Sequence, residues 1–218
     1  MSDHRISIKT SLLWTGLYFC VMLLYTAVDL TVWRKLDGPY AEWCILVTMI
    51  ALSAVFLLIL QAKTSFRIKI LEHTTRKGIL LAVLCAVLFY FLLDKGLDPF
   101  FERLFPVSET AYQESMLSLA KSPVSSFIHV CLAAPVIEEI LMRGFVLGGL
   151  RNTKGGLAAL LISAVLFALL HFNMVQTLSA LVCGVVLGLL YIKTGSLFCC
   201  ILTHCLYNVI SYFVMLFG

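Results

Sequence analysis

Long apolar stretches alternate with short polar ones along almost the whole chain. A membrane-spanning helix needs about 20 mostly apolar residues, and the apolar stretches here approach or exceed that length. We predict seven membrane-spanning helices, over residues 11–33, 40–62, 78–98, 123–149, 155–171, 174–193 and 196–217. The predicted fold is therefore an all-α, polytopic transmembrane helical bundle.

The composition agrees with this pattern and excludes a soluble enzyme. Of 218 residues, 61% are hydrophobic and 13% are charged, whereas a soluble domain carries about 45–50% apolar and about 25% charged residues. The eight cysteines include no CxxC pair, so neither a zinc ribbon nor a thioredoxin-type site is indicated. We interpret them as small apolar packing residues.

The distribution of Lys and Arg predicts the orientation, because loops on the cytoplasmic side carry an excess of both. The segment 63–77 contains five of them. If it is cytoplasmic and the helices alternate, ten Lys and Arg residues face the cytoplasm: Arg5, Lys9, Lys63, Arg67, Lys69, Arg76, Lys77, Arg151, Lys154 and Lys193. Five face outward: Arg34, Lys35, Lys95, Arg103 and Lys121. The N-terminus is then cytoplasmic and the C-terminus outside.

Two further features concern helix packing and the membrane surface. Gly144 with Gly148, and Gly184 with Gly188, have the small-xxx-small spacing that lets helices approach closely in lipid. We predict close packing within the chain, with dimerisation as the alternative. The segment 99–122, which includes Glu109 and Glu114, is predicted to lie at the membrane surface.

The predicted helices in the second half of the chain contain polar groups that lipid does not tolerate. Glu138, Glu139 and Arg143 interrupt 123–149. His171 ends 155–171, and 196–217 contains His204 and Asn208. A charged side chain at bilayer depth costs roughly 2.5–3.5 kcal/mol on insertion scales, and it persists mainly where it faces the protein interior or a wet cavity.

The spacing of these groups suggests different tasks for neighbouring residues. Glu139 and Arg143 are four residues apart and can pair on one helix face. Glu138 is turned from Glu139 by about 100°, so one carboxylate can be structural while the other faces a cavity. His171 follows Phe167 by one turn, and Asn208 follows His204 by one turn.

Together these helices offer a carboxylate base, two imidazoles and an amide. Such a set can activate water and hold an oxyanion, as peptide hydrolysis requires. The competing interpretation is that the histidines only form hydrogen bonds between helices. We assign that structural role to His129.

These motifs resemble the CAAX-protease and bacteriocin-processing membrane peptidase (CPBP, or Abi) family. The family motifs EExxxR, FxxxH and HxxxN appear in order as Glu138-Glu139-Ile-Leu-Met-Arg143, Phe167-Ala-Leu-Leu-His171 and His204-Cys-Leu-Tyr-Asn208. The resemblance covers residues 123–210. It implies one integral membrane domain in which 1–122 form three helices with an interfacial segment and 123–218 form the catalytic four-helix core.

The resemblance also implies a function, that of an intramembrane endopeptidase acting on a membrane-associated peptide or protein. Glu138 with His171 would activate the attacking water, and His204 with Asn208 would stabilise the oxyanion. Glu139, Arg143 and Phe167 would support these residues. The implied substrates are CAAX-type tails or peptide and bacteriocin leaders, the implied location is a bacterial plasma membrane, and no nucleic acid is involved.

The metal dependence and two other functions stay open at this stage. No cofactor is certain, but a divalent metal such as zinc would bind Glu138, His171 and His204, as in an intramembrane metalloprotease. HExxH is absent, so the chain is not a zincin. A non-enzymatic scaffold or bacteriocin immunity protein of the same fold is one alternative. A proton-coupled transporter is the other.

Overall fold

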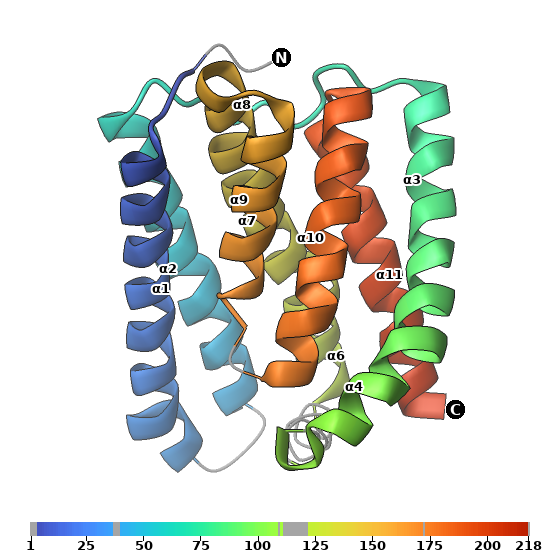
Figure 1. Ribbon diagram of the computed structural model, residues 1–218. Helices are drawn as coiled ribbons and strands as arrows, with labels where there is room; N and C mark the ends of the chain where they lie inside the picture. Colours follow the sequence, from blue (N-terminus) through green and yellow to red (C-terminus); the bar gives the residue numbers. More distant parts are fainter. Residues whose placement is uncertain (1–3, 37–39, 109, 111–121, 172, 218) are drawn as a thin grey trace.

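The protein is a bundle of helices, seen here in a computed structural model that describes residues 4–36, 40–108, 110, 122–171 and 173–217 (Figure 1). No strand occurs within these ranges. The N-terminal part contains α1 (Ile8–Thr31), η1 (Trp33–Lys35), α2 (Tyr40–Lys63), α3 (Arg76–Phe89), η2 (Tyr90–Leu97) and α4 (Asp98–Leu104). The C-terminal part contains α6 (Pro123–Phe127), η3 (Ile128–Ala133), α7 (Ala134–Glu139), η4 (Ile140–Leu147), α8 (Gly148–Lys154), α9 (Gly156–Ala168), α10 (Met174–Thr194) and α11 (Leu197–Phe217).

Two of these series are continuous helices with π-helical stretches inside them. α3, η2 and α4 follow one another without a break, and so do α6, η3, α7, η4 and α8. The stretches η2, η3 and η4 are π-helical, and η4 directly follows the Glu138–Glu139 pair. Single π-helical turns in α-helices occur frequently at functional sites.

Every predicted span corresponds to helix, but the expected count of about seven spans is not confirmed. Among the described residues, five helices are long and apolar enough to cross a membrane: Ile8–Lys35, Tyr40–Lys63, Arg76–Leu104, Met174–Thr194 and Leu197–Phe217. The prediction for 155–171 was too long, because α9 ends at Ala168 and a turn follows, in which the His171 amide bonds to the Ala168 carbonyl at 3.0 Å. The helix that holds Glu138, Glu139 and Arg143 is not among the five. The chain is a multi-pass membrane protein.

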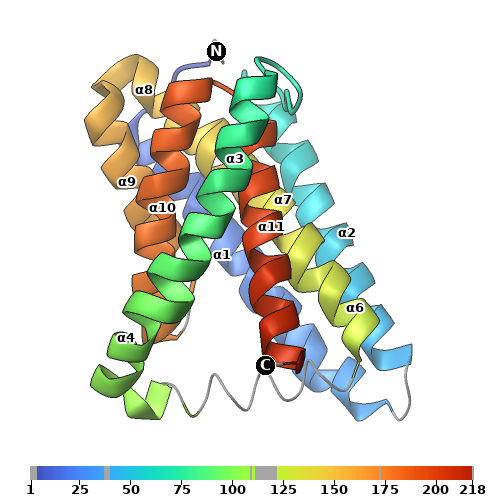
Figure 2. The ribbon, with the colours of Figure 1, turned by 90° about the vertical axis from the view of Figure 1, so that its right-hand side faces the viewer.

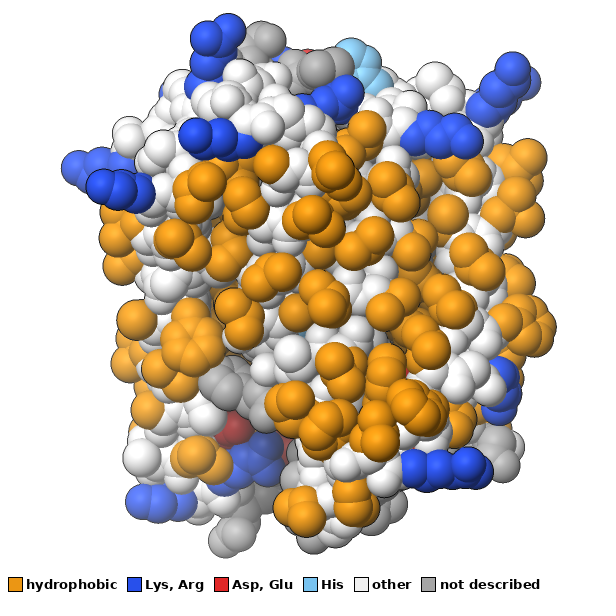
Figure 3. Space-filling view, in the orientation of Figure 1, with side chains coloured by type: hydrophobic (Ala, Val, Ile, Leu, Met, Phe, Trp, Pro, Cys, Tyr) orange, Lys and Arg blue, Asp and Glu red, His pale blue; other side chains and the backbone are white. Residues whose placement is uncertain are grey.

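The helices run alternately up and down between two ends of the bundle (Figures 1 and 2). The N-terminus, the 63–77 segment, α8 and the turn at Gly195 lie at one end; α4, the start of α6 and the C-terminus lie at the other. Contacts support this grouping, since the Phe198 amide bonds to the Ile70 carbonyl at 3.0 Å and the Tyr212 hydroxyl donates to the Pro123 carbonyl at 2.8 Å. Apolar side chains cover the middle of the visible face, and Lys and Arg gather towards its ends (Figure 3).

A short segment before α1 packs against the end of the bundle that holds α8. His4 is buried, and its Nε2 donates to the Phe145 carbonyl at 2.8 Å while its ring stacks on the Phe145 ring. Asn152 donates to the His4 carbonyl at 3.0 Å. Burial lowers the pKa of His4, so the neutral ring is favoured in this contact.

The segment expected at the membrane surface is described only in part. α4 belongs to it and exposes Phe100 and Leu104, whereas Glu109 and Glu114 lie outside the described residues. The other end of α4 contacts the bundle interior, because Ser179 donates a hydrogen bond to Asp98.

The helix carrying Glu139 and Arg143 lies inside the bundle. Every residue of η4 is buried, and α9, α10 and α11 pack around it. α9 and α10 approach each other closely at Gly184, where an added Cβ would lie 2.9 Å from the Ala164 Cα. The predicted packing of this glycine within the chain is confirmed.

This close approach predicts that Gly184→Ala destabilises the protein. The new methyl group would meet the backbone of α9, which cannot move aside as a flexible side chain can, so we expect a loss of about 1–3 kcal/mol. Gly16→Ala on α1 is the matched control, since nothing lies within 4 Å of the position that its new methyl group would take. Thermal unfolding in detergent measures both variants, and equal stability of the two would contradict the packing argument.

Candidate active site

Glu139 and Arg143 form an ion pair in the interior, as their spacing predicts. Arg143 Nη1 donates to Glu139 Oε1 at 2.8 Å, and both side chains are completely buried. Arg143 Nη2 also donates to the Gly184 carbonyl at 3.4 Å. The guanidinium carbon lies 4.6 Å from the centre of the Phe167 ring, a distance typical of a cation–π contact.

His204 connects this pair to the second carboxylate. Its Nδ1 lies 3.0 Å from Glu139 Oε1, and because a carboxylate only accepts, Nδ1 carries the proton. Its Nε2 lies 3.9 Å from Glu138 Oε2, and the Glu138 side chain is 21% exposed. The expectation that one glutamate is enclosed and the other faces a cavity is confirmed.

His171 is held by the residue one turn before it. Its Nδ1 lies 3.1 Å from the Phe167 carbonyl, so Nδ1 donates and Nε2 is the nitrogen left for other partners. The edges of the His171 and His204 rings both contact Phe167, with ring centres 5.1 Å and 5.9 Å away. Phe167 therefore sets the positions of Arg143 and both imidazoles.

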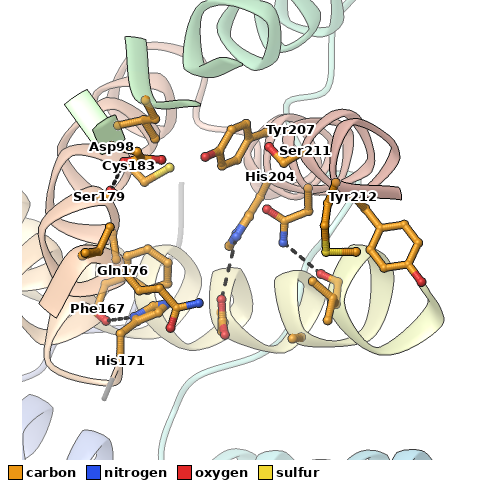
Figure 4. A pocket seen from close by; sticks show the side chains of 18 of the residues that line it. Asp98, Phe167, His171, Gln176, Ser179, Cys183, His204, Tyr207, Ser211 and Tyr212 are labelled. Atoms are coloured by element: carbon orange, nitrogen blue, oxygen red, sulfur yellow. Dashed lines mark hydrogen bonds and ion pairs between the residues drawn. The ribbon is translucent and has the colours of Figure 1, made fainter. Parts of the chain in front are cut away.

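A cavity of about 290 Å³ joins these side chains, and Figure 4 shows His171 and His204 pointing into it, His171 from the turn after α9 and His204 from α11. Glu138 and Asn208 line it as well, whereas Glu139 and Arg143 lie behind its wall. The structure thus brings together Glu138, His171, His204 and Asn208, the four residues predicted to be catalytic.

Asn208 has a contact that the sequence did not predict. Its Nδ2 donates to the Val130 carbonyl at 2.8 Å. A π-helical stretch such as η3 has carbonyls that its irregular pattern of hydrogen bonds can leave for other donors. This contact fixes the amide at the cavity wall and joins α11 to η3.

The sequence analysis missed the lining residues Tyr207 and Ser211 and their partner Asp94, although one rule could have found Asp94. The Tyr207 and Ser211 hydroxyls, on the same face of α11 as His204, each donate to Asp94 at 2.7 Å. Asp94 is an ionisable residue in an apolar segment, which marks it as a candidate by the criterion used for Glu138. His129 was assigned a structural role; it contacts the Tyr25 ring and also lines the cavity.

The proposed metal ligands do not form a convergent set. Within the described ranges, no group of three His, Cys, Asp or Glu side chains is placed to hold a metal ion. The Nδ1 atoms of His204 and His171 are engaged by Glu139 and by the Phe167 carbonyl. The Nε2 atoms stay available, and histidines that bind a metal through one nitrogen usually donate the other N–H to a carboxylate or a carbonyl in this way. A metal held by Glu138, His171 and His204 stays a proposal to be tested, and no chemical step below depends on one.

What remains is an arrangement suited to proton transfer at a bound water. Glu138 Oε2 and His204 Nε2 are 3.9 Å apart. A water molecule to the side of the line between them can therefore form a hydrogen bond of about 2.8 Å to each. Its oxygen would lie at the cavity wall, where a carbonyl carbon can approach. A carboxylate base beside an imidazole is a combination that supports hydrolysis.

We predict that Arg143→Ala destabilises the protein by roughly 3–5 kcal/mol, because it leaves the buried Glu139 charge uncompensated. The control is Lys154→Ala, an exposed cation near the end of the same continuous helix. Thermal unfolding compares them. The double variant Glu139→Gln/Arg143→Met removes both charges and should recover much of the lost stability. Full stability of Arg143→Ala would refute the pairing.

Comparison with known proteins agrees with these motifs. Residues 120–210 match the family model described as type II CAAX prenyl endopeptidase Rce1-like, and the match includes every residue of the three motifs. No curated protein and no solved structure gives a significant match. Residues 120–210 are thus similar to the type II CAAX prenyl endopeptidase Rce1-like family, in agreement with the resemblance of the three motifs.

Proposed function

We propose that this chain is an intramembrane endopeptidase that hydrolyses a peptide bond in a membrane-associated peptide or protein, such as a CAAX-type tail or a peptide leader. The observation that carries the proposal is the position of Glu138. Its carboxylate lies at the wall of an internal cavity, 3.9 Å from the imidazole of His204. The family match of 120–210 supports the same reaction class.

In the first step Glu138 acts as the general base. It removes a proton from the water while the water oxygen bonds to the substrate carbonyl carbon. Nε2 of His171 accepts a hydrogen bond from the other O–H of that water and orients it, since Nδ1 already donates to the Phe167 carbonyl. General-base catalysis of this kind contributes typically about 10²–10⁴-fold to the rate.

In the second step the oxyanion needs hydrogen-bond donors. His204, which carries protons on both nitrogens throughout the cycle, donates from Nε2 to the oxyanion, while the Glu139 carboxylate at Nδ1 stabilises the imidazolium. The remaining N–H of Asn208 is the second donor, because one N–H is used on Val130. Collapse of the intermediate breaks the C–N bond, and Glu138 returns its proton to the leaving amine.

The first test is Glu138→Gln, which keeps the shape of the side chain and removes the base. We expect cleavage to fall by about 10²–10⁴-fold, with normal abundance and thermal stability, because this side chain is partly exposed. Comparative peptidomics of cells that carry either form identifies the substrate, and purified protein then gives the rate.

Glu139→Gln serves as the matched control for that test. It changes the adjacent carboxylate, which contacts Arg143, and should lower stability as well as activity. Near-normal turnover by Glu138→Gln would remove Glu138 from the reaction. It would also leave room for a non-enzymatic role such as a membrane scaffold or immunity protein.

The second test concerns Asn208. Loss of one oxyanion donor typically costs about 10²–10³ in turnover, so Asn208→Ala should lower kcat by that order with little change in KM. Thr203→Val is the control, since it also removes a hydrogen bond from α11 to a backbone carbonyl, that of Ala82, and Thr203 does not line the cavity. If both variants slow cleavage equally, Asn208 acts only by anchoring α11.

The third test separates a metal-free reaction from a metalloprotease. We expect chelator-washed, purified protein to keep its activity, because Glu138 accounts for every proton transfer and the two imidazoles for the orientation of the water and the stabilisation of the oxyanion. Metal content and activity are measured on the same sample before and after washing. Stoichiometric zinc whose removal and return track activity would reject the metal-free reaction and keep Glu138, His171 and His204 as ligands.

A further inference from the structure

The cavity extends towards only one end of the bundle. Glu138 and His204 line it, and along α11 its lining continues from His204 through Ser211 and Tyr212 to Met215. Gln176 in the first turn of α10 and Glu102 on α4 also line it. All these elements meet at the end that holds the C-terminus (Figures 1 and 2).

Towards the other end the interior is closed. Leu141, Met142 and Phe145 are completely buried, and Phe66 and Leu197 are at most 3% exposed. His4 and its hydrogen bond to the Phe145 carbonyl complete this closure. A second hollow at this end measures about 20 Å³ and shares no lining residue with the large cavity.

The two ends differ in their positive charge. The closed end carries ten described Lys and Arg residues, from Arg5 in the N-terminal segment to Lys193 at the end of α10, with five of them in 63–77. At the other end, towards which the cavity extends, the described residues include four, which are Arg34, Lys35, Lys95 and Arg103. Because Lys and Arg are retained on the cytoplasmic side, the closed end is assigned to the cytoplasm.

Because the interior is closed towards the end assigned to the cytoplasm and the cavity extends towards the opposite end, we propose that substrates reach Glu138 from the non-cytoplasmic side of the membrane. The substrate class is then an exported peptide, or a segment of a membrane protein that already faces that side. A lipid-modified tail presented in the cytoplasm would meet the closed end, so of the two substrates named in the proposed function this inference keeps the peptide leader and excludes the CAAX-type tail. This inference rests on the proposed peptidase function for its chemistry, whereas the side of access follows from the cavity and the charges.

The side of access is tested first by labelling single cysteines. They are introduced into a variant from which all eight native cysteines have been removed, including Cys183, which lines the cavity. Gln176→Cys and Met215→Cys report on the cavity. Thr110→Cys reports on the end of the bundle towards which the cavity extends, and Leu71→Cys reports on the closed end. A charged, membrane-impermeant maleimide is added to right-side-out or inverted vesicles. We expect Gln176→Cys, Met215→Cys and Thr110→Cys to be labelled in right-side-out vesicles. Leu71→Cys should be labelled only in inverted vesicles.

The second measurement uses the unmodified protein and a library of charged, internally quenched peptides. Right-side-out vesicles should cleave it without detergent, whereas inverted vesicles should show no cleavage until detergent is added. Glu138→Gln vesicles of both kinds are the control for other peptidases. Cleavage by intact inverted vesicles, or labelling of the cavity positions from the same side as Leu71→Cys, would overturn the proposal.

The two proposals fail in different ways. If the library is not cleaved even in detergent, the peptidase function is contradicted, while labelling still decides the side of access. If detergent-treated protein cleaves the library but intact inverted vesicles do so too, the function stands and the entry side is wrong.

Discussion

The Glu139 carboxylate accepts hydrogen bonds from Arg143 and His204 inside a bundle that provides no bulk water. Removing such charges from water costs several kcal/mol per ion, and close, well-directed contacts must offset that cost. Phe167 beneath the guanidinium and the Gly184 carbonyl beside it provide the remaining contacts. The ion pair therefore requires α9, α10 and α11 to sit at fixed distances from the central helix.

This cluster is not optimised for stability alone. Within the described part of the chain, Glu139 Oε2 and Arg143 Nε are buried without a hydrogen-bond partner. Most buried polar atoms in native proteins are paired, and apolar residues of similar volume are often no less stable than a buried ion pair. The arrangement instead holds His204 with one nitrogen fixed and the other directed at Glu138, which is what the proposed reaction uses.

The sequence predicted the helical segments and the residues that meet in the cavity, for identifiable reasons. Apolar length marks a helix in lipid, and the four-residue spacing of Glu139 and Arg143 places both on one face. The sequence could not predict where α9 ends, because the turn before His171 depends on tertiary contacts. The bond from Asn208 to Val130 likewise depends on how η3 departs from α-helical geometry, which hydrophobic periodicity does not encode.

The central helix also has a consequence for how the protein enters the membrane. Its carboxylates and guanidinium make it a poor candidate for independent insertion, since each charge costs roughly 2.5–3.5 kcal/mol at the centre of a span. Arg143 can neutralise Glu139 as soon as the helix forms, but Gly184 and His204 lie 41 and 65 residues further along the chain than their partners. This helix is therefore synthesised before the groups that accommodate it exist. Its stable integration into the bilayer must await α10 and α11, which provide the Gly184 carbonyl and His204. The central helix and these later helices therefore integrate together, and insertion of α11 completes the bundle.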